Sequence, residues 1–150
     1  MAGDATGMTA GVIGLGAMGL GIAQSLRRAQ LDVRVFDVRR DAAQAFARDG
    51  GSACATAAQL AASCDVVVSA VVNAAQTEEV LFGEGGAAAA MRQGSAFMMC
   101  STVDPNWSSA LSRNSARTRI RPTIAMITPI NAASIASTRK GSCVYQRLAP

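Results

Sequence analysis

The sequence predicts an α/β domain built on a doubly wound parallel sheet, and three observations lead to that prediction. Within residues 1–111, short apolar segments alternate with segments whose apolar residues have helical spacing. Residues 65–72 (DVVVSAVV) are apolar almost throughout, which is typical of a parallel strand covered on both faces. A glycine-rich turn joins the first apolar segment to the first helical one. The chain has 150 residues, half of them hydrophobic, which is enough for one domain with a buried core.

Each predicted element has a local signal in the sequence. We expect strands at 9–13, 33–37, 65–72 and 95–100, and helices at 18–29, 40–49, 56–63, 73–82, 87–91 and 104–111. Gly50 and Gly51 end the second helix, because glycine adopts a left-handed backbone at little cost. Thr56 is a suitable N-cap for the third helix, and Asp104 followed by Pro105 is typical of the start of the last.

The charge of the chain changes at residue 112. Residues 1–111 contain seven Arg against ten Asp and Glu, a net charge of −3. Residues 112–150 contain six Arg and one Lys without any acid, a net charge of +7, so the overall +4 comes from this last segment. We expect residues 1–111 to form the folded domain and residues 112–150 to be a basic, poorly ordered tail. Residues 120–127 have the composition of one strand, but Pro122 argues against a central position in a sheet.

Three interpretations of the basic tail remain open. The change in charge, composition and periodicity at Ser112 is abrupt, which suggests a broken reading frame or gene and a sheet that is incomplete at its C-terminal end. A spliced or divergent C-terminus is the alternative. Seven cations could also bind a polyanion such as RNA or a phospholipid surface. The tail has one Tyr and no aromatic pattern, however, which does not favour nucleic acid as a partner.

Composition excludes several classes of site. The chain has no histidine, and its four cysteines, at positions 54, 64, 100 and 143, form no CxxC pair. A zinc site containing His, a Ser-His-Asp triad and a Cys-His dyad are therefore excluded. Isolated cysteines fit free thiols in a reducing compartment, so we expect a cytoplasmic protein. No apolar segment approaches the roughly 20 residues needed to cross a membrane, and residues 1–10 lack the pattern of a secretory signal.

The glycine-rich turn, residues 14–19 (GLGAMG), carries the functional signal. It follows a predicted strand and opens a helix, and Asp37 stands at the end of the next strand, 23 residues after Gly14. This context, with an acid roughly 20 residues downstream, is typical of a Rossmann-type dinucleotide site. Gly14 would allow the tight turn, Gly16 would let the backbone approach a pyrophosphate, and Gly19 would let the helix pack against the strand. Amides at the helix N-terminus would hold the pyrophosphate, and Asp37 would accept hydrogen bonds from the adenosine ribose.

This turn has two other interpretations. A generic glycine-rich turn between a strand and a helix needs no ligand, but it does not explain the spacing to Asp37. A Walker-type phosphate loop is excluded, because no GK[ST] sequence follows the glycines.

Three stretches of the chain resemble the cofactor domain of the β-hydroxyacid dehydrogenases. They are residues 11–26 (GVIGLGAMGLGIAQSL), 65–86 (DVVVSAVVNAAQTEEVLFGEGG) and 101–105 (STVDP). That family includes the 3-hydroxyisobutyrate, tartronate-semialdehyde and L-threonate dehydrogenases and, more distantly, 6-phosphogluconate dehydrogenase. The GLGxMG form is typical of it, and VVNAAQTEEVLFG is most similar to the L-threonate branch. The resemblance implies reversible hydride transfer between the carbinol carbon of a short hydroxy acid and a nicotinamide.

The resemblance also implies roles for individual residues. Residues 14–18 would line the pyrophosphate, Val71 and Val72 would flank the adenine-side ribose and the middle of the cofactor, and Gln76 would contact the cofactor. Thr102 would meet the nicotinamide end, and Ser101 would face the substrate. Plain core packing is the alternative for the two valines, and a helix-capping turn is the alternative for Ser101 and Thr102. The candidate cofactor-binding residues are therefore Gly14, Leu15, Gly16, Ala17, Met18, Gly19, Asp37, Val71, Val72, Gln76 and Thr102, and the candidate substrate-binding residue is Ser101.

The end of the second predicted strand bears on the choice between NAD and NADP. Asp37 favours NAD, because a carboxylate at this position repels a 2′-phosphate. Arg39 and Arg40 come shortly after Asp37 and could weaken the preference for NAD, so NADP remains an alternative. We favour reading the two arginines as the solvated first turn of the next helix.

The chain departs from the family in ways that concern catalysis. The family continues with a DAPVSGG-like turn that grips the substrate carboxylate and a GxxKxxN helix whose lysine is the general acid and base. Neither motif is present, and Lys140, the single lysine, matches neither the spacing nor the surroundings. We therefore predict no catalytic residue, dinucleotide binding at best and no turnover by this chain alone. A non-catalytic dinucleotide-binding module is the alternative. Gln30 stands where the family usually has glycine, so a left-handed backbone there would cost roughly 1 kcal/mol more.

Overall fold

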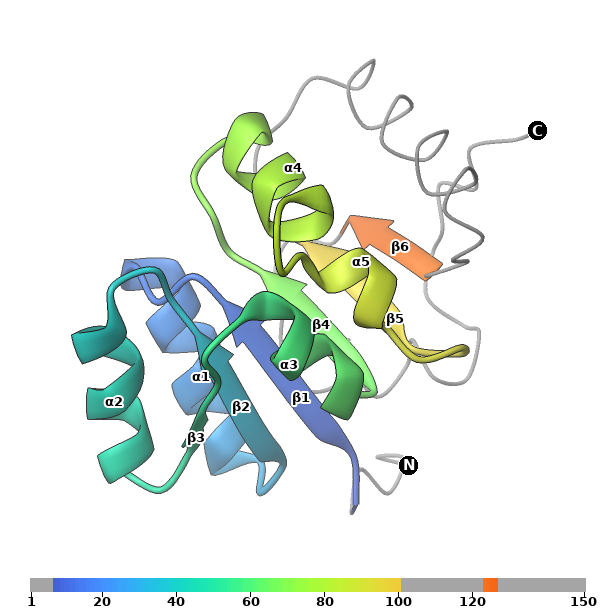
Figure 1. Ribbon diagram of the computed structural model, residues 1–150. Coiled ribbons are helices and arrows are strands. Elements are labelled where there is room, and N and C mark those ends of the chain that lie inside the picture. The colour runs from blue at the N-terminus through green and yellow to red at the C-terminus, as the bar shows by residue number, and fades with distance from the viewer. Residues whose placement is uncertain (1–6, 101–122, 127–150) are drawn as a thin grey trace.

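The computed structural model describes residues 7–100 and 123–126, and within them it has one parallel sheet of six strands (Figure 1). The spatial order is β3-β2-β1-β4-β5-β6, and every neighbouring pair is parallel. The strands are β1 (Thr9–Ile13), β2 (Asp32–Phe36), β3 (Ser52–Ala53), β4 (Val66–Ser69), β5 (Ala96–Met99) and β6 (Thr123–Met126). The helices are α1 (Ala17–Arg28), α2 (Arg40–Arg48), α3 (Ala57–Ser63), α4 (Ala74–Phe82) and α5 (Ala87–Ala90).

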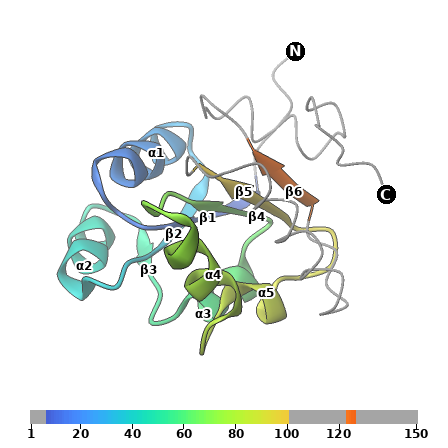
Figure 2. The ribbon, with the colours of Figure 1, turned by 90° about the horizontal axis from the view of Figure 1, so that it is seen from above.

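Helices cover both faces of the sheet, which confirms the predicted doubly wound α/β class. Figure 2 shows α1 on one side of the central strands and α3, α4 and α5 on the other. Successive residues of a strand point to opposite faces, so the central strands contribute to two separate cores. In β4, Val66 and Val68 belong to the core under α1 and α2, whereas Val67 belongs to the core under α3 and α5. This double burial explains why residues 65–72 carry almost no polar side chain.

The elements agree with the sequence prediction except at two strands. β4 is shorter than predicted, because residues 70–72 leave the sheet and form the loop toward α4. β3 was not predicted, since its two residues are exposed and carry no apolar pattern. It pairs with β2 through Arg34 and Val35 and forms one edge of the sheet. The predicted helix at 104–111 lies outside the described residues.

Helix α3 is capped as its sequence predicts. The Thr56 hydroxyl accepts a hydrogen bond from the Gln59 amide at 3.1 Å, and the Gln59 side-chain oxygen accepts one from the Ala55 amide at 2.8 Å. Two backbone donors at the helix start are thus satisfied by side chains, which fixes where the helix begins. The expected left-handed end of α2 is also confirmed, because Gly50 has a φ of +99°.

Part of the basic segment adds a strand to the sheet. β6 follows Pro122 directly and pairs parallel with β5 at the opposite edge from β3. A strand here agrees with the composition of residues 120–127, and its edge position agrees with the constraint from Pro122. The rest of residues 112–150 lies outside the described residues, so the poorly ordered tail and the domain boundary at 111 stay predictions.

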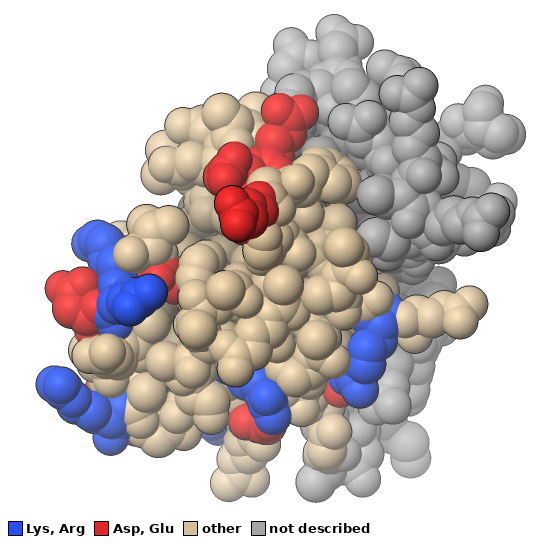
Figure 3. Space-filling model, viewed as in Figure 1, with Lys and Arg blue, Asp and Glu red and all other residues tan. Residues whose placement is uncertain are grey.

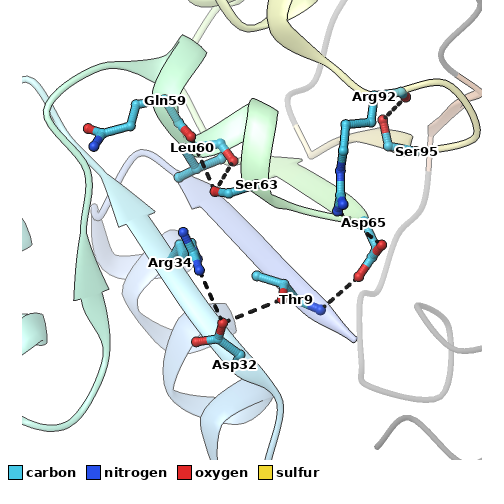
Figure 4. Close-up of polar contacts among 9 residues, drawn as sticks. All are labelled: Thr9, Asp32, Arg34, Gln59, Leu60, Ser63, Asp65, Arg92 and Ser95. Atoms are coloured by element: carbon cyan, nitrogen blue, oxygen red, sulfur yellow. Dashed lines mark hydrogen bonds and ion pairs between the residues drawn. The ribbon is translucent and has the colours of Figure 1, made fainter. Parts of the chain in front are cut away.

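At its amino edge the sheet is tied together by side chains (Figure 4). Asp65 accepts a hydrogen bond from the Thr9 amide at 2.9 Å and forms an ion pair with Arg92 at 3.2 Å. Asp32 pairs with Arg34 at 3.6 Å and lies 3.4 Å from the Thr9 hydroxyl. The starts of β1, β2 and β4 are therefore linked to one another. Polar groups at this edge are largely paired within the protein.

Among the described helices, none combines the length and apolar character needed to cross a bilayer.

The end of α1 tests the energetic cost of a left-handed residue. Gln30 has a φ of +61°, as its place in the sequence suggested, and its amide bonds to the Arg27 carbonyl at 2.9 Å. We expect Gln30→Gly to raise the free energy of unfolding by about 1 kcal/mol, because glycine adopts this backbone without a Cβ clash. Urea denaturation followed by circular dichroism measures the change.

Gln24→Gly is the matched control, because Gln24 is exposed in the middle of the same helix. It should lower the free energy of unfolding by roughly 1 kcal/mol. A loss of stability in both variants would contradict the strain at Gln30.

Candidate functional site

The candidate residues gather where β1 and β4 end side by side. Helix α1 follows β1 toward β2, whereas α4 follows β4 toward β5, so the connections diverge between these two strands. Ligands of open α/β sheets bind at such a switch point, outside the carboxyl ends of the strands. The loops there are fixed by backbone hydrogen bonds, from Gly14 to the Phe36 carbonyl at 2.9 Å and from Ala70 to the Ile13 carbonyl at 2.8 Å.

The three glycines of the turn have three different physical roles. Gly14 has a φ of +89°, and a Cβ there would lie 3.0 Å from the Ala70 carbonyl oxygen. A Cβ on Gly19 would overlap the Gly14 carbonyl, so α1 lies directly against the turn. A Cβ on Gly16 would meet no atom of the described residues within 4 Å. Glycine at 14 and 19 is thus required by the fold, whereas Gly16 faces open space where a ligand can approach the backbone.

The N-terminus of α1 opens onto that same space. Gly16 is its N-cap and supplies no side-chain cap, Ala17 and Met18 are exposed, and the first turn contains no acidic residue. The first amides of a helix have no acceptor within the helix and carry a partial positive charge. The first turn of α1 has no carboxylate that could accept hydrogen bonds from these amides. The amides therefore suit an anionic group such as a pyrophosphate.

Asp37 lies directly behind the turn, and its carboxylate is directed at the protein. The residue is only 8% exposed. Its Oδ2 accepts a hydrogen bond from the Leu15 amide at 2.6 Å, and its Oδ1 accepts one from the Arg39 amide at 2.8 Å. Nε of Arg39 lies 3.5 Å from the same Oδ1. The acid is therefore at the predicted position, and the predicted contact with a ribose stays a prediction.

The Gln76 side chain makes a hydrogen bond within the protein that was not predicted from the sequence. Its side-chain oxygen accepts a hydrogen bond from the Val72 amide at 3.0 Å, while Asn73 accepts one from the Gln76 amide at 2.9 Å. This is the arrangement seen at α3, and the sequence signal is the repeated pattern TAAQ at 56–59 and NAAQ at 73–76. Gln76 thus shapes the β4–α4 loop, and its predicted contact with a cofactor stays a prediction.

Exposed apolar side chains mark the same edge of the sheet. Met18, Val38 and Val72 follow the carboxyl ends of β1, β2 and β4 and are 56%, 86% and 82% exposed. Within the described part of the chain, Leu20 of α1 is the other large hydrophobic residue that is exposed. Val71 is half-buried beside the turn, with its Cγ1 3.3 Å from where a Gly14 Cβ would be. Apolar side chains beside open helix amides suit a ligand that combines a ring with a phosphate. Sequence reasoning missed Val38, which stands alone between Asp37 and the arginines.

The cysteines of the described region are free thiols whose pKa values are raised by burial. Burial raises the pKa of Cys64 to about 11 and that of Cys100 to about 12. Burial also raises the pKa of Cys54. A protonated thiol is a poor nucleophile and metal ligand. Among residues 7–100 and 123–126, no three His, Cys, Asp or Glu side chains are grouped to hold a metal ion. Ser101 and Thr102 lie outside the described residues.

Charge on the visible face is divided into small groups (Figure 3). Acidic side chains gather over α4, which carries Glu78 and Glu79. Lys and Arg side chains lie in separate groups, with no continuous basic patch among the described residues of this face.

Comparison with known proteins covers this same region. Residues 9–126, which include every strand from β1 to β6, match the NAD binding domain of 6-phosphogluconate dehydrogenase. The chain is 54% identical over 103 residues to an L-threonate dehydrogenase of Cupriavidus necator, which covers 69% of the chain and 35% of that protein. An L-threonate dehydrogenase of Escherichia coli is 39% identical over 94 residues, 62% of the chain and 31% of that protein. The chain thus spans about a third of the length of these curated relatives.

Solved structures agree with the fold. A 3-hydroxyisobutyrate dehydrogenase of Salmonella typhimurium superposes with a TM-score of 0.69 at 33% identity, over 79% of this chain and 40% of that one. An oxidoreductase of Pseudomonas putida superposes with a TM-score of 0.72 at 23% identity, over 83% of this chain and 42% of that one, which supports the fold alone. The glycine turn, the open N-terminus of α1 and a match that runs from β1 to β6 lead to one conclusion: the chain belongs to the family of the NAD-binding domain of 6-phosphogluconate dehydrogenase.

Proposed function

We propose that this chain binds NAD at the carboxyl edge of its sheet, as the cofactor-binding part of an oxidoreductase that acts on the CH–OH group of a short hydroxy acid. The observation that carries the proposal is the open space over Gly16, beside the exposed N-terminus of α1. A glycine that the fold itself does not require is explained by a ligand that must reach the backbone.

The residues present fit a dinucleotide. Amides at Ala17 and Met18 would hold the pyrophosphate, and Gly16 would leave room for it. The apolar side chains of Val38, Val71 and Val72 would flank the adenosine half. By resemblance, Thr102 would meet the nicotinamide and Ser101 the substrate. Bound NAD would supply the hydride acceptor, and these residues would hold and orient it.

The surroundings of Asp37 favour NAD over NADP. A buried carboxylate directly behind the turn makes a second negative group at the adenosine ribose unfavourable. Arg39 acts against this preference for NAD, because its positively charged side chain is 63% exposed and lies within ion-pair distance of Asp37. NADP binding therefore remains an alternative.

A short hydroxy acid of the L-threonate type is the substrate that we propose for a full-length form. The relative with 54% identity is an L-threonate dehydrogenase, and the β4–α4 segment resembles that branch. We place the protein in the cytoplasm, since free thiols such as Cys54 and Cys64 fit a reducing compartment. A non-catalytic dinucleotide-binding module is the second candidate, because the chain spans about a third of such enzymes.

Gly16→Val tests the proposed binding site. A Cβ at this position meets no atom of the described residues within 4 Å, whereas the valine side chain would occupy the approach of the pyrophosphate. We expect NAD binding to be abolished, as measured by isothermal titration calorimetry. The free energy of unfolding should change by no more than about 0.5 kcal/mol.

Gly21→Val is the matched control, since Gly21 lies on α1 and its Cβ would likewise meet no described atom within 4 Å. It should leave NAD affinity unchanged. NAD affinity that survives Gly16→Val would contradict the proposed site. Affinity for RNA that survives Gly16→Val and falls steeply with salt would favour the polyanion alternative instead.

Turnover by the isolated chain separates binding from catalysis. We expect no NADH to form from L-threonate or 3-hydroxyisobutyrate, because oxidation of an alcohol needs a proton acceptor and the family's lysine has no counterpart here. Absorbance at the NADH band, with NAD binding confirmed on the same sample, measures the outcome. Sustained NADH production would show that the chain contains a proton acceptor that we have not assigned.

A further inference from the structure

We propose that Gln76 is a positioning residue for the dinucleotide site, and that its side chain holds the β4–α4 loop (residues 70–73) in the shape that receives the ligand. The inference rests on the proposed function, since it concerns how the same site is organised. It starts from the hydrogen bond of 3.0 Å that the Gln76 side-chain oxygen accepts from the Val72 amide. This role differs from a direct contact with the cofactor, and the two have different consequences for substitutions at this position.

The β4–α4 loop packs against the glycine turn. A Cβ on Gly14 would lie 3.0 Å from the Ala70 carbonyl oxygen and 3.3 Å from Cγ1 of Val71. A Cβ on Gly19 would lie 3.2 Å from the Ala70 Cβ. The Ala70 amide donates to the Ile13 carbonyl at 2.8 Å, so the start of the loop is fixed by the end of β1. The loop therefore borders the turn at which the pyrophosphate is proposed to bind.

The second half of the loop is held by hydrogen bonds to the first turn of α4. The Val72 side chain is 82% exposed, so core packing contributes little to its position. Its amide donates to the side chain of Gln76, which extends back from that first turn. The Asn73 side chain accepts a hydrogen bond from the Gln76 amide at 2.9 Å, and the Asn73 carbonyl accepts one from the Thr77 hydroxyl at 3.0 Å. These contacts set the direction of the chain at Val72.

The position of Val72 matters because of where it lies. It follows the carboxyl end of β4, and its apolar side chain is open to the adenosine half of the proposed ligand. A typical hydrogen bond shifts a local equilibrium by about threefold to tenfold. Where the loop leaves its binding-competent shape for part of the time, the apparent affinity falls by the fraction that remains competent. Gln76 therefore acts on affinity through the backbone of Val72.

Helix α3 has the same arrangement in a different part of the fold. Gln59 is exposed like Gln76 and stands at the same position of its helix, and its side-chain oxygen accepts a hydrogen bond from the Ala55 amide at 2.8 Å. The start of α3 follows β3, two strands away from β1, and its Ala58 amide bonds to the Gly85 carbonyl at 2.9 Å. Substitutions at Gln59 and Gln76 thus remove the same kind of hydrogen bond in two places, one of which borders the proposed site.

Titration of NAD into four forms of the chain tests the role of Gln76. Isothermal titration calorimetry compares the wild type, Gln76→Ala, Gln76→Glu and Gln59→Ala at high salt, which screens the added charge of the glutamate. We expect Gln76→Ala to weaken NAD binding by about threefold to tenfold. Gln76→Glu should restore the affinity, because a carboxylate keeps the acceptor for the Val72 amide. Gln59→Ala should leave the affinity unchanged, although it lowers stability toward urea as much as Gln76→Ala does.

Two patterns of affinity would overturn the proposal. An equal loss in Gln76→Ala and Gln76→Glu would indicate that the amide nitrogen of Gln76 contacts the cofactor, so that the acceptor is not what matters. An equal loss in Gln76→Ala and Gln59→Ala would indicate a general effect of lowered stability. If Gln76→Ala does not fold, Gln76→Met replaces it with the same expectation, because methionine keeps the length of the side chain and has only a weak acceptor.

Exchange of backbone amides in the free protein gives a second readout that needs no ligand. By NMR, the Val72 amide should exchange at least about threefold faster in Gln76→Ala than in the wild type, and Gln76→Glu should restore the slow exchange. The Ala70 amide, which bonds to the Ile13 carbonyl, is the internal reference and should not change. Exchange of Val72 that is the same in Gln76→Ala as in the wild type would contradict the proposed contact.

The failure of the two proposals is distinguishable. A wild-type chain that binds no NAD overturns the proposed function. Normal binding by the wild type that is equally strong in Gln76→Ala overturns only the role of Gln76.

Discussion

The close approach of α1 to the end of β1 is the constraint on which the site depends. Gly19 lies against the Gly14 carbonyl, and no side chain fits between them. Because the helix can lie this near, its first turn lies beside Gly14 and Ala70, which follow the ends of β1 and β4 where the connections diverge. Moving the helix outward by the thickness of a methyl group would carry its first amides away from the switch point. The glycine spacing therefore sets where an anion can bind.

The two edges of the sheet differ in how their polar groups are satisfied. At the amino edge, Asp65 pairs with both the Thr9 amide and Arg92 and links the starts of β1 and β4. At the carboxyl edge, the loops instead expose helix amides and the side chains of Val38 and Val72. This asymmetry supports binding at the carboxyl edge without reference to relatives.

The buried carboxylate of Asp37 connects these parts. It is placed by the end of β2 but acts on the turn after β1, so it makes one unit of two loops that are distant in sequence. A buried charge would be unfavourable if it lacked partners, and its partners are the Leu15 amide of the glycine turn and the amide and guanidinium of Arg39. The hydrogen bond from the Leu15 amide therefore stabilises the buried carboxylate and also holds the turn in its shape.

The sequence by itself determined the α/β class, the glycine turn, the caps of α2 and α3 and the left-handed Gln30, because each depends on neighbouring residues or on a short repeat. It also identified Asp37, since the spacing of turn and acid is local to one strand-helix-strand unit. Only the tertiary structure decided that the Asp37 carboxylate points at Leu15 and that the Gln76 side chain accepts a hydrogen bond from the Val72 amide. It also decided that β3 and β6 form the edges of the described sheet. These features depend on contacts between segments far apart in the chain, and spacing alone carries no information about direction.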